Sequence, residues 1–218
     1  MTTAPTPRAR ARRLHENAAY DRASIDAILD AMPVAHVGYV LEGCPVVTPT
    51  LQWREGDRVF WHGSSASRAL RQGKGREVCI NVTIVDGYVL GRSGFNHSVN
   101  SRSVTLFGTA ELVPEEEKAR HLTGLIEGLW PGRAAMLRPM LPQEVKATVL
   151  LSLPIHEASA KIRSGPPEDE PDDYALPIWA GVIPVTQGVS APISDPRNLD
   201  DVQVPEHVTA FTWRLPGA

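Results

Sequence analysis

A run of small hydroxyl residues that ends in an arginine is the part of the sequence most suited to binding an anionic ligand. Residues 60–68 read Phe-Trp-His-Gly-Ser-Ser-Ala-Ser-Arg, so an apolar stretch gives way to Gly63, Ser64 and Ser67 and then to Arg68. A strand that ends in such a turn before a helix exposes backbone N–H groups, and adjacent hydroxyls and a guanidinium suit a phosphate monoester. The alternative is an ordinary N-capped surface helix.

Other catalytic patterns are mostly missing from the sequence. It contains no GxSxG, HExxH, Walker or GxGxxG motif, which argues against nucleotide hydrolysis and Rossmann chemistry. Cys44 and Cys79 lie in apolar, strand-like runs, where an inert buried thiol is typical. His36, His62 and His97 have no mutual spacing that suggests a metal centre. We therefore expect no metal site.

The composition limits the class of protein further. With 218 residues, 42% of them hydrophobic, the chain can bury its own core without disulfide or metal staples. Its formal net charge is -3 and its basic residues form no dominant tract, which argues against a nucleic-acid partner. No apolar stretch approaches the roughly 18 residues that span a bilayer, and the N-terminus is polar. We expect a cytoplasmic protein with no membrane partner.

The elements that must position these residues are mainly short strands. Apolar residues at helical spacing after Asp21 predict a helix that ends before Pro33. Alternating runs then predict strands over 34–41, 45–53 and 58–62, which are joined by turn residues. The Asp86-Gly87 pair between residues 77–85 and 88–92 is a typical hairpin signal.

The second half of the chain continues this pattern. It predicts a strand over 102–113, helices over 115–130 and 142–147, and strands around Pro154 within 148–162. It also predicts a last strand within 176–185, at an edge of the sheet or in an interface. Six or seven antiparallel strands with two or three helices indicate a mainly β (α+β) fold. We expect a closed or partly closed antiparallel β-barrel with a few short peripheral helices.

Three segments differ in composition. Residues 1–13 contain two prolines and many arginines but little apolar surface, which predicts a flexible basic tail. Residues 14–186 hold the barrel elements and form one domain. Residues 187–218 are rich in proline and weakly patterned, and we expect this extension to wrap the surface.

The order and separation of several motifs resemble the pyridoxamine 5'-phosphate oxidase-related flavoproteins. The similarity covers roughly residues 21–185 and is greatest to the branch that includes the nitroimidazole-resistance proteins. The motifs are Val46-Val47-Thr48-Pro49-Thr50, residues 60–68, Arg102-Ser103-Val104 with Phe107-Gly108, residues 159–165, and residues 179–184.

This resemblance implies a split antiparallel β-barrel that forms a homodimer and binds FMN at the subunit interface. It places Val47, Thr48, Pro49 and Thr50 beside the isoalloxazine ring and Trp179 as a contact to that ring. It places His62, Gly63, Ser64, Ser67 and Arg68 on the ribityl phosphate side, with Arg102, Lys161 and Arg163 as further cofactor contacts. His62 matches a histidine near the flavin, and it is the candidate proton donor, with a purely structural role as the alternative.

Two departures from the family pattern narrow the expected function. Ser101 stands where this branch commonly has tyrosine, and the Arg-x-His signature of the true pyridoxamine phosphate oxidases is missing after Trp179. The missing signature argues against an enzyme of vitamin B6 synthesis. The resemblance implies an FMN-dependent oxidoreductase that passes hydride or electrons from a reduced nicotinamide to a small-molecule substrate, a nitroaromatic or quinone-like acceptor. The alternatives are a flavin store or redox sensor, and a haem-binding split barrel with His97 or His62 as axial ligand.

Overall fold

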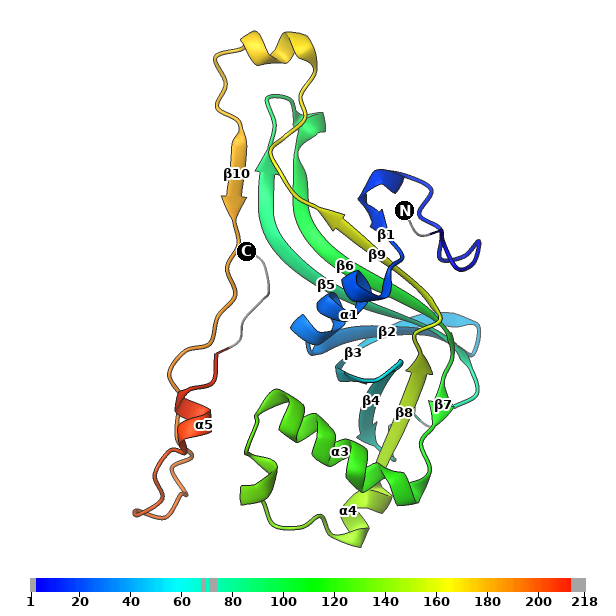
Figure 1. Cartoon of the computed structure of the whole chain (residues 1–218), viewed down its shortest axis with the longest axis vertical. Helices are drawn as coiled ribbons and strands as arrows, with labels where there is room; N and C mark the ends of the chain where they lie inside the picture. Colours follow the sequence, from blue (N-terminus) through cyan, green and yellow to red (C-terminus); the bar gives the residue numbers. More distant parts are fainter. Residues whose placement is uncertain (1–2, 68–69, 71–73, 213–218) are drawn as a thin grey trace.

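The computed structural model of the protein describes residues 3–67, 70 and 74–212. In this part of the chain one antiparallel sheet has the order β1-β9-β6-β5-β2-β3-β4-β8-β7, and β10 pairs with β5 (Figure 1). The strands are β1 (Ala18–Ala19), β2 (Val34–Leu41), β3 (Cys44–Glu55), β4 (Arg58–Ser64), β5 (Glu77–Leu90), β6 (Ser98–Thr109), β7 (Glu111–Leu112), β8 (Thr148–Pro154), β9 (Glu157–Arg163) and β10 (Gly181–Pro184).

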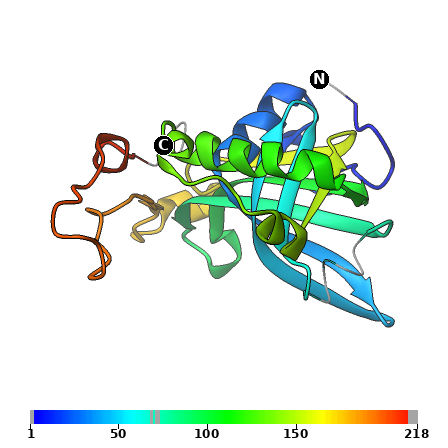
Figure 2. The same ribbon diagram turned by 90° about the horizontal axis from the view of Figure 1, so that it is seen from below.

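Short helices surround this sheet. They are α1 (Arg22–Ala31), α3 (Glu115–Leu129), α4 (Pro142–Ala147) and α5 (Glu206–Thr209), with 3-10 turns η1 (His15–Asn17), η2 (Gly94–Asn96), η3 (Ala134–Met136) and η4 (Pro171–Ala175). The sheet curls around a core, and in the view of Figure 2 helix α3 (green) lies in front of α1 (blue) and of the strands. The predicted mainly β architecture, a split antiparallel barrel with peripheral helices, is confirmed.

The turn between β2 and β3 follows the sequence prediction. Leu41 pairs with Cys44, so Glu42 and Gly43 form a two-residue connection. Both have positive φ angles, 52° and 81°, which is the backbone that such a tight hairpin needs. This turn fixes the register in which Thr48 and Thr50 face Val37 and Ala35.

The prediction of a hairpin at Asp86-Gly87 is wrong. Strand β5 runs without a turn from Glu77 to Leu90, and the dipeptide forms a bulge where the β5–β6 register shifts. A Cβ built on Gly87 would lie 2.9 Å from Val182 Cγ1 and 3.0 Å from the carbonyl oxygen of Ile183. The glycine is therefore needed for the close approach of β10 and not for a reversal of the chain.

Helix α1 closes the main hydrophobic core. Asp21 caps it, because its carboxylate accepts a hydrogen bond from Ser24 N at 2.8 Å, which also lowers the pKa of that carboxyl. Ile25, Ile28 and Leu29 point into the core, as their spacing predicts. Gln52 of β3 is buried beside the end of this helix.

A smaller core lies under α3. It contains Trp53, Phe60 and Leu150 of the sheet and Leu125 of the helix. The helix begins after Pro114 with three glutamates in its first turn, which the helix dipole favours, and the predicted helix is confirmed. Strand β4 thus contributes side chains to a hydrophobic core on each of its two faces.

The two terminal segments differ in how they contact the barrel. In the basic segment 1–13, Ala9 is buried and Arg8 forms ion pairs with Glu77 and Glu157. The flexibility expected of this segment stays a prediction. Residues 186–204 are exposed throughout, and the extension contacts the body near its end, where the rings of Trp130 and Phe211 lie 6.4 Å apart. In Figure 1 it runs beside the barrel as an arm, so wrapping of a surface also stays a prediction.

No helix in the described ranges is long and apolar enough to cross a membrane.

We expect Gln52→Leu to lower the free energy of unfolding by about 2–4 kcal/mol. The Nε2 of Gln52 donates hydrogen bonds to the carbonyl oxygens of Leu29 and Met32, both at 2.6 Å. Leucine would leave these carbonyls at the end of α1 without their buried donor. Urea denaturation followed by circular dichroism measures the change.

The matched control is Gln187→Leu, the same substitution at an exposed position of the extension. It should shift the urea midpoint little. Equal effects of the two variants would contradict the role of Gln52 as a cap for α1.

Candidate functional site

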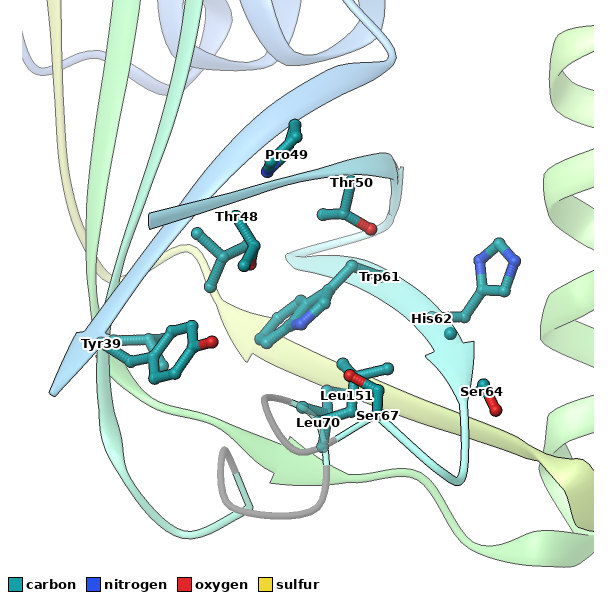
Figure 3. Close-up of a pocket in the computed structure, with 13 residues that line it drawn as sticks. Tyr39, Thr48, Pro49, Thr50, Trp61, His62, Ser64, Ser67, Leu70 and Leu151 are labelled. Atoms are coloured by element: carbon teal, nitrogen blue, oxygen red, sulfur yellow. The ribbon is translucent and has the colours of Figure 1, made fainter. Parts of the chain in front are cut away.

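A cavity opens at the end of the barrel between β2, β3 and β4. Its volume is about 200 Å³ (Figure 3). Its walls combine apolar and aromatic side chains with several hydroxyls. The lining residues are Val37, Tyr39, Thr48, Pro49, Thr50, Trp61, His62, Gly63, Ser64, Ser67, Leu70, Val78 and Leu151.

Strand β3 supplies one wall of the cavity. Because side chains alternate along a strand, Thr48 and Thr50 turn to the cavity side, opposite Val37 and Ala35 of β2. Pro49 also contributes to the lining. Val47 does not, and its side chain is 64% exposed on the outer side of the sheet. Three of the four β3 residues predicted to lie beside the ring therefore line the cavity.

Strand β4 brings a tryptophan and a histidine to the cavity in opposite orientations. The Trp61 ring is buried in the main core and forms the cavity floor. The imidazole of His62 points away from it in Figure 3 and lies edge-on to Trp53, with ring centroids 6.0 Å apart. His62 Nδ1 is buried and has no hydrogen-bond partner among the described residues. Burial lowers the pKa of His62, which favours the neutral imidazole.

The turn after β4 carries the hydroxyls that the sequence singled out. Ser64 and Ser67 both line the cavity. Within the turn, Ser64 Oγ accepts a hydrogen bond from Ala66 N at 3.1 Å, and Ser67 N donates to the carbonyl oxygen of Ser64 at 2.9 Å. Arg68 lies outside the described residues, and so does most of the helix predicted to follow. Its role in phosphate binding stays a prediction.

Four other predicted contacts lie apart from this cavity. Arg102 pairs with Asp86 at 2.7 Å at the β5 bulge, and Arg163 hydrogen-bonds Asn100. Lys161 is exposed on β9, and Trp179 is 68% exposed just before β10. None of these side chains lines the cavity of its own chain. Their contact with cofactor stays a prediction.

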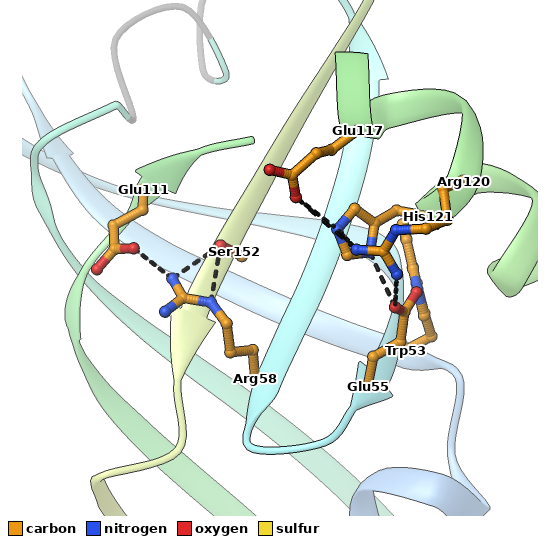
Figure 4. A network of polar contacts seen from close by, with 8 residues as sticks. All are labelled: Trp53, Glu55, Arg58, Glu111, Glu117, Arg120, His121 and Ser152. Atoms are coloured by element: carbon orange, nitrogen blue, oxygen red, sulfur yellow. Dashed lines mark hydrogen bonds and ion pairs between the residues drawn. The ribbon is translucent and has the colours of Figure 1, made fainter. Parts of the chain in front are cut away.

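A polar network beside the cavity was not predicted from the sequence (Figure 4). Glu55 accepts hydrogen bonds from Trp53 Nε1 and His121 Nδ1, each at 2.9 Å, and Arg120 lies 2.8 Å from His121 Nε2. A guanidinium can only donate, so His121 Nε2 accepts and Nδ1 donates to Glu55. The network fixes the Trp53 ring that packs against His62. The sequence places His121 on a helix but does not indicate that it contacts Glu55, because the two residues are 66 positions apart.

A second polar contact in the same view ties the neighbouring strands together. The Arg58 guanidinium donates to Ser152 Oγ at 2.9 Å and pairs with Glu111 at 2.5 Å. Figure 4 shows this contact on the other side of β4 from His121, and it joins β4 to β7 and β8.

Tyr39 and Leu70 were also missed as cavity residues. Tyr39 follows the alternation of β2, in which Val37 and Tyr39 face inward. The alternation of apolar residues in β2 could therefore have identified Tyr39 as a cavity residue, but not Leu70. Among the described residues, no group of three or more histidine, cysteine or acidic side chains could hold a metal ion.

Two solved structures are similar to this chain over nearly its whole length. The flavocytochrome Anf3 of Azotobacter vinelandii is 49% identical, with a TM-score of 0.93 over 96% of this chain and 99% of that one. An FAD- and haem-binding protein of Mycobacterium smegmatis is 37% identical, with a TM-score of 0.87 over 91% and 98% of the two chains.

A more distant structure shares the fold alone. A candidate 5-nitroimidazole antibiotic resistance protein of Bacteroides thetaiotaomicron is 21% identical, with a TM-score of 0.54 over 66% of this chain and 86% of that one. A search of curated protein sequences gave no match. A family model described as pyridoxamine 5'-phosphate oxidase matches residues 21–162, and the chain therefore belongs to that family.

Proposed function

We propose that this protein is a flavocytochrome-like redox protein that holds a flavin and a haem. The observation that carries the proposal is the similarity to two structures, 49% and 37% identical, described as a flavocytochrome and as an FAD- and haem-binding protein. Both similarities extend beyond the barrel into the arm, since they cover more than 90% of this chain. Flavin binding itself fits the family to which the chain belongs.

The chemistry of the cavity fits part of a flavin. Thr48, Thr50 and Ser67 offer hydroxyls to a polar ring edge or a ribityl chain, while Trp61 and Tyr39 give an apolar wall for a ring. We propose FAD in place of the FMN expected from the sequence, because one of the two relatives is described as binding FAD. Ser64 in the turn after β4 is exposed, so a phosphate bound at this turn would be open to solvent.

Bound flavin would accept a hydride and haem would carry single electrons, so together they would convert two-electron to one-electron chemistry. The residues of this chain would bind the flavin and orient it. Thr48 and Thr50 hold polar atoms at the cavity wall, and Trp61 excludes water from the floor. We propose the haem as the flavin's electron acceptor, instead of the nitroaromatic or quinone expected from the sequence. A reduced nicotinamide remains the proposed donor.

We further propose a homodimer in which a second copy completes each flavin site. Two observations support this proposal. The cavity of one chain is small for a whole FAD, and Lys161, Arg163 and Trp179 lie apart from it. The arm also leaves apolar side chains in solvent, with Ile193 97% and Leu199 73% exposed, and a partner could cover them.

The absorption spectrum of the purified protein tests the function directly. We expect flavin bands and a haem Soret band together, and the flavin released by heating should match FAD in mass. A protein with flavin bands but no affinity for added haemin would contradict the flavocytochrome proposal and support the flavin-dependent alternatives. A protein without either cofactor would contradict it entirely.

We expect Gly63→Val to weaken flavin binding about tenfold or more, which corresponds to about 1.4 kcal/mol. A Cβ built on Gly63 would lie 2.5 Å from Leu70 Cδ1, so a larger side chain must displace Leu70, which lines the cavity. Titration of the apoprotein, followed by flavin fluorescence, measures the dissociation constant. Gly188→Val is the control, because a Cβ at exposed Gly188 meets no atom within 4 Å. An unchanged dissociation constant for Gly63→Val would place the flavin elsewhere.

For the homodimer, we expect light scattering to give twice the mass of one chain for the flavin-loaded protein. Removal of flavin should weaken the association if both chains contact it. A monomer that retains flavin tightly would contradict the shared site and leave the cavity of a single chain as the binding site.

A further inference from the structure

The far end of the β5–β6 hairpin carries an exposed apolar surface outside the flavin cavity. Tyr88 of β5 lies directly opposite Val99 of β6 on one side and Ile183 of β10 on the other. Directly opposite residues share a face of the sheet, so the three side chains form a row. They are 54%, 39% and 50% exposed. We call these three residues the apolar row.

A histidine adjoins this row with one ring nitrogen already engaged. His97 precedes Val99 by two residues in extended backbone, which places it along the same face. Its Nδ1 lies 2.9 Å from the carbonyl oxygen of Ser93. A carbonyl only accepts hydrogen bonds, so Nδ1 carries the proton and Nε2 presents its lone pair. Histidines that bind metals are typically oriented in this way.

The turn that presents His97 is held rigidly from a distant segment. The Asp169 side chain, fully buried, accepts hydrogen bonds from Arg92 N at 2.8 Å and from Asn96 Nδ2 at 3.2 Å. The Arg92 guanidinium also pairs with Asp169 and lies over the Tyr174 ring, 4.9 Å from its centroid. Asp169 thereby fixes both ends of the η2 turn.

Four other histidines in the described chain offer less to an iron. His121 is buried and bonded through both nitrogens. His62 and His207 each have a buried nitrogen without a described partner, so neither has its ring oriented by a second group at that atom. His15 lies beside Glu16 on the exposed N-terminal turn. Of the seven histidines, His97 is the one with a described Nδ1 contact to a backbone carbonyl.

We propose that His97 Nε2 is the axial ligand of a haem that contacts the apolar row. This inference rests on the proposed function and goes beyond it by assigning the site. Apolar side chains suit the porphyrin, and Phe95 in the same turn, 89% exposed, adds further apolar surface. Arg163 and Lys161 continue the same face, opposite Ser101 and Ser103, and supply positive charge for the propionates.

The test compares His97→Ala with His36→Ala in the full-length protein. His36 is the control, since it is also exposed on the sheet but has no described oriented ring nitrogen. Haemin titration is followed by the Soret band and by electron paramagnetic resonance of the ferric protein. We expect His97→Ala to weaken haem binding by about 100-fold and to lose the imidazole-ligand signal, while flavin binding is unchanged.

Two further variants separate ligation from structure. His97→Cys should retain haem with the signature of a thiolate ligand, and imidazole added to His97→Ala should restore the wild-type spectrum. Asp169→Asn should weaken haem binding by about tenfold, because it loosens the turn that positions His97.

Unchanged haem spectra in His97→Ala would overturn the assignment, as would loss of the ligand signal in His36→Ala or His62→Gln instead. A wild-type protein that does not bind haemin would overturn the proposed function as well. Failure of the His97 assignment and failure of the proposed function are distinguishable, because the assignment is tested only when the wild-type protein binds haem.

Discussion

Strand β5 forms ladders with three other strands, and its register positions both proposed sites. It pairs with β6 along most of its length, with β2 over Cys79–Asn81, and with β10 over Gly87–Leu90. Val78, Ile80, Val82 and Ile84 point inward at every second position, as does Val89 after the bulge. A slip of one residue would turn this whole apolar set toward solvent.

The bulge at Asp86 makes the second half of β5 possible. Ile84 and Val89 are five residues apart and both buried, which a regular strand with a two-residue period cannot achieve. One extra residue restores the inward orientation. The Asp86 carboxylate is held by Arg102 of β6 at 2.9 and 2.7 Å, so the irregular residue is paired across the ladder. The same shift turns Tyr88 outward into the apolar row.

The barrel was predictable because its helices and strands follow from residue patterns within short segments. The site was less predictable because it depends on contacts between residues that lie far apart in the sequence. The spacing of Ile25, Ile28 and Leu29 was enough for α1, because it reports burial within one helix. The Asp86-Gly87 signal failed because the same dipeptide serves a bulge when another strand approaches closely.

The site shows the same limit. Alternation in β3 places Thr48 and Thr50 in the cavity, but nothing in the sequence pairs Glu55 with His121. The orientation of His62 depends on strand parity as well. Its neighbour Trp61 enters the main core, so His62 must face the side that α3 covers. Motif matching identifies the residue but not its direction.

The two proposed cofactor sites lie at different positions along β5, and this separation constrains how they could work together. Val78 lines the flavin cavity, while Tyr88 belongs to the apolar row. Ten residues of extended strand span at most about 33 Å. The two proposed sites of one chain therefore lie towards opposite ends of β5. In the proposed homodimer, a second path would run from the haem site of one chain to the flavin cavity of its partner. The proposed haem site and the proposed homodimer are therefore linked, because the arrangement of the two chains would decide which flavin lies nearer to each haem.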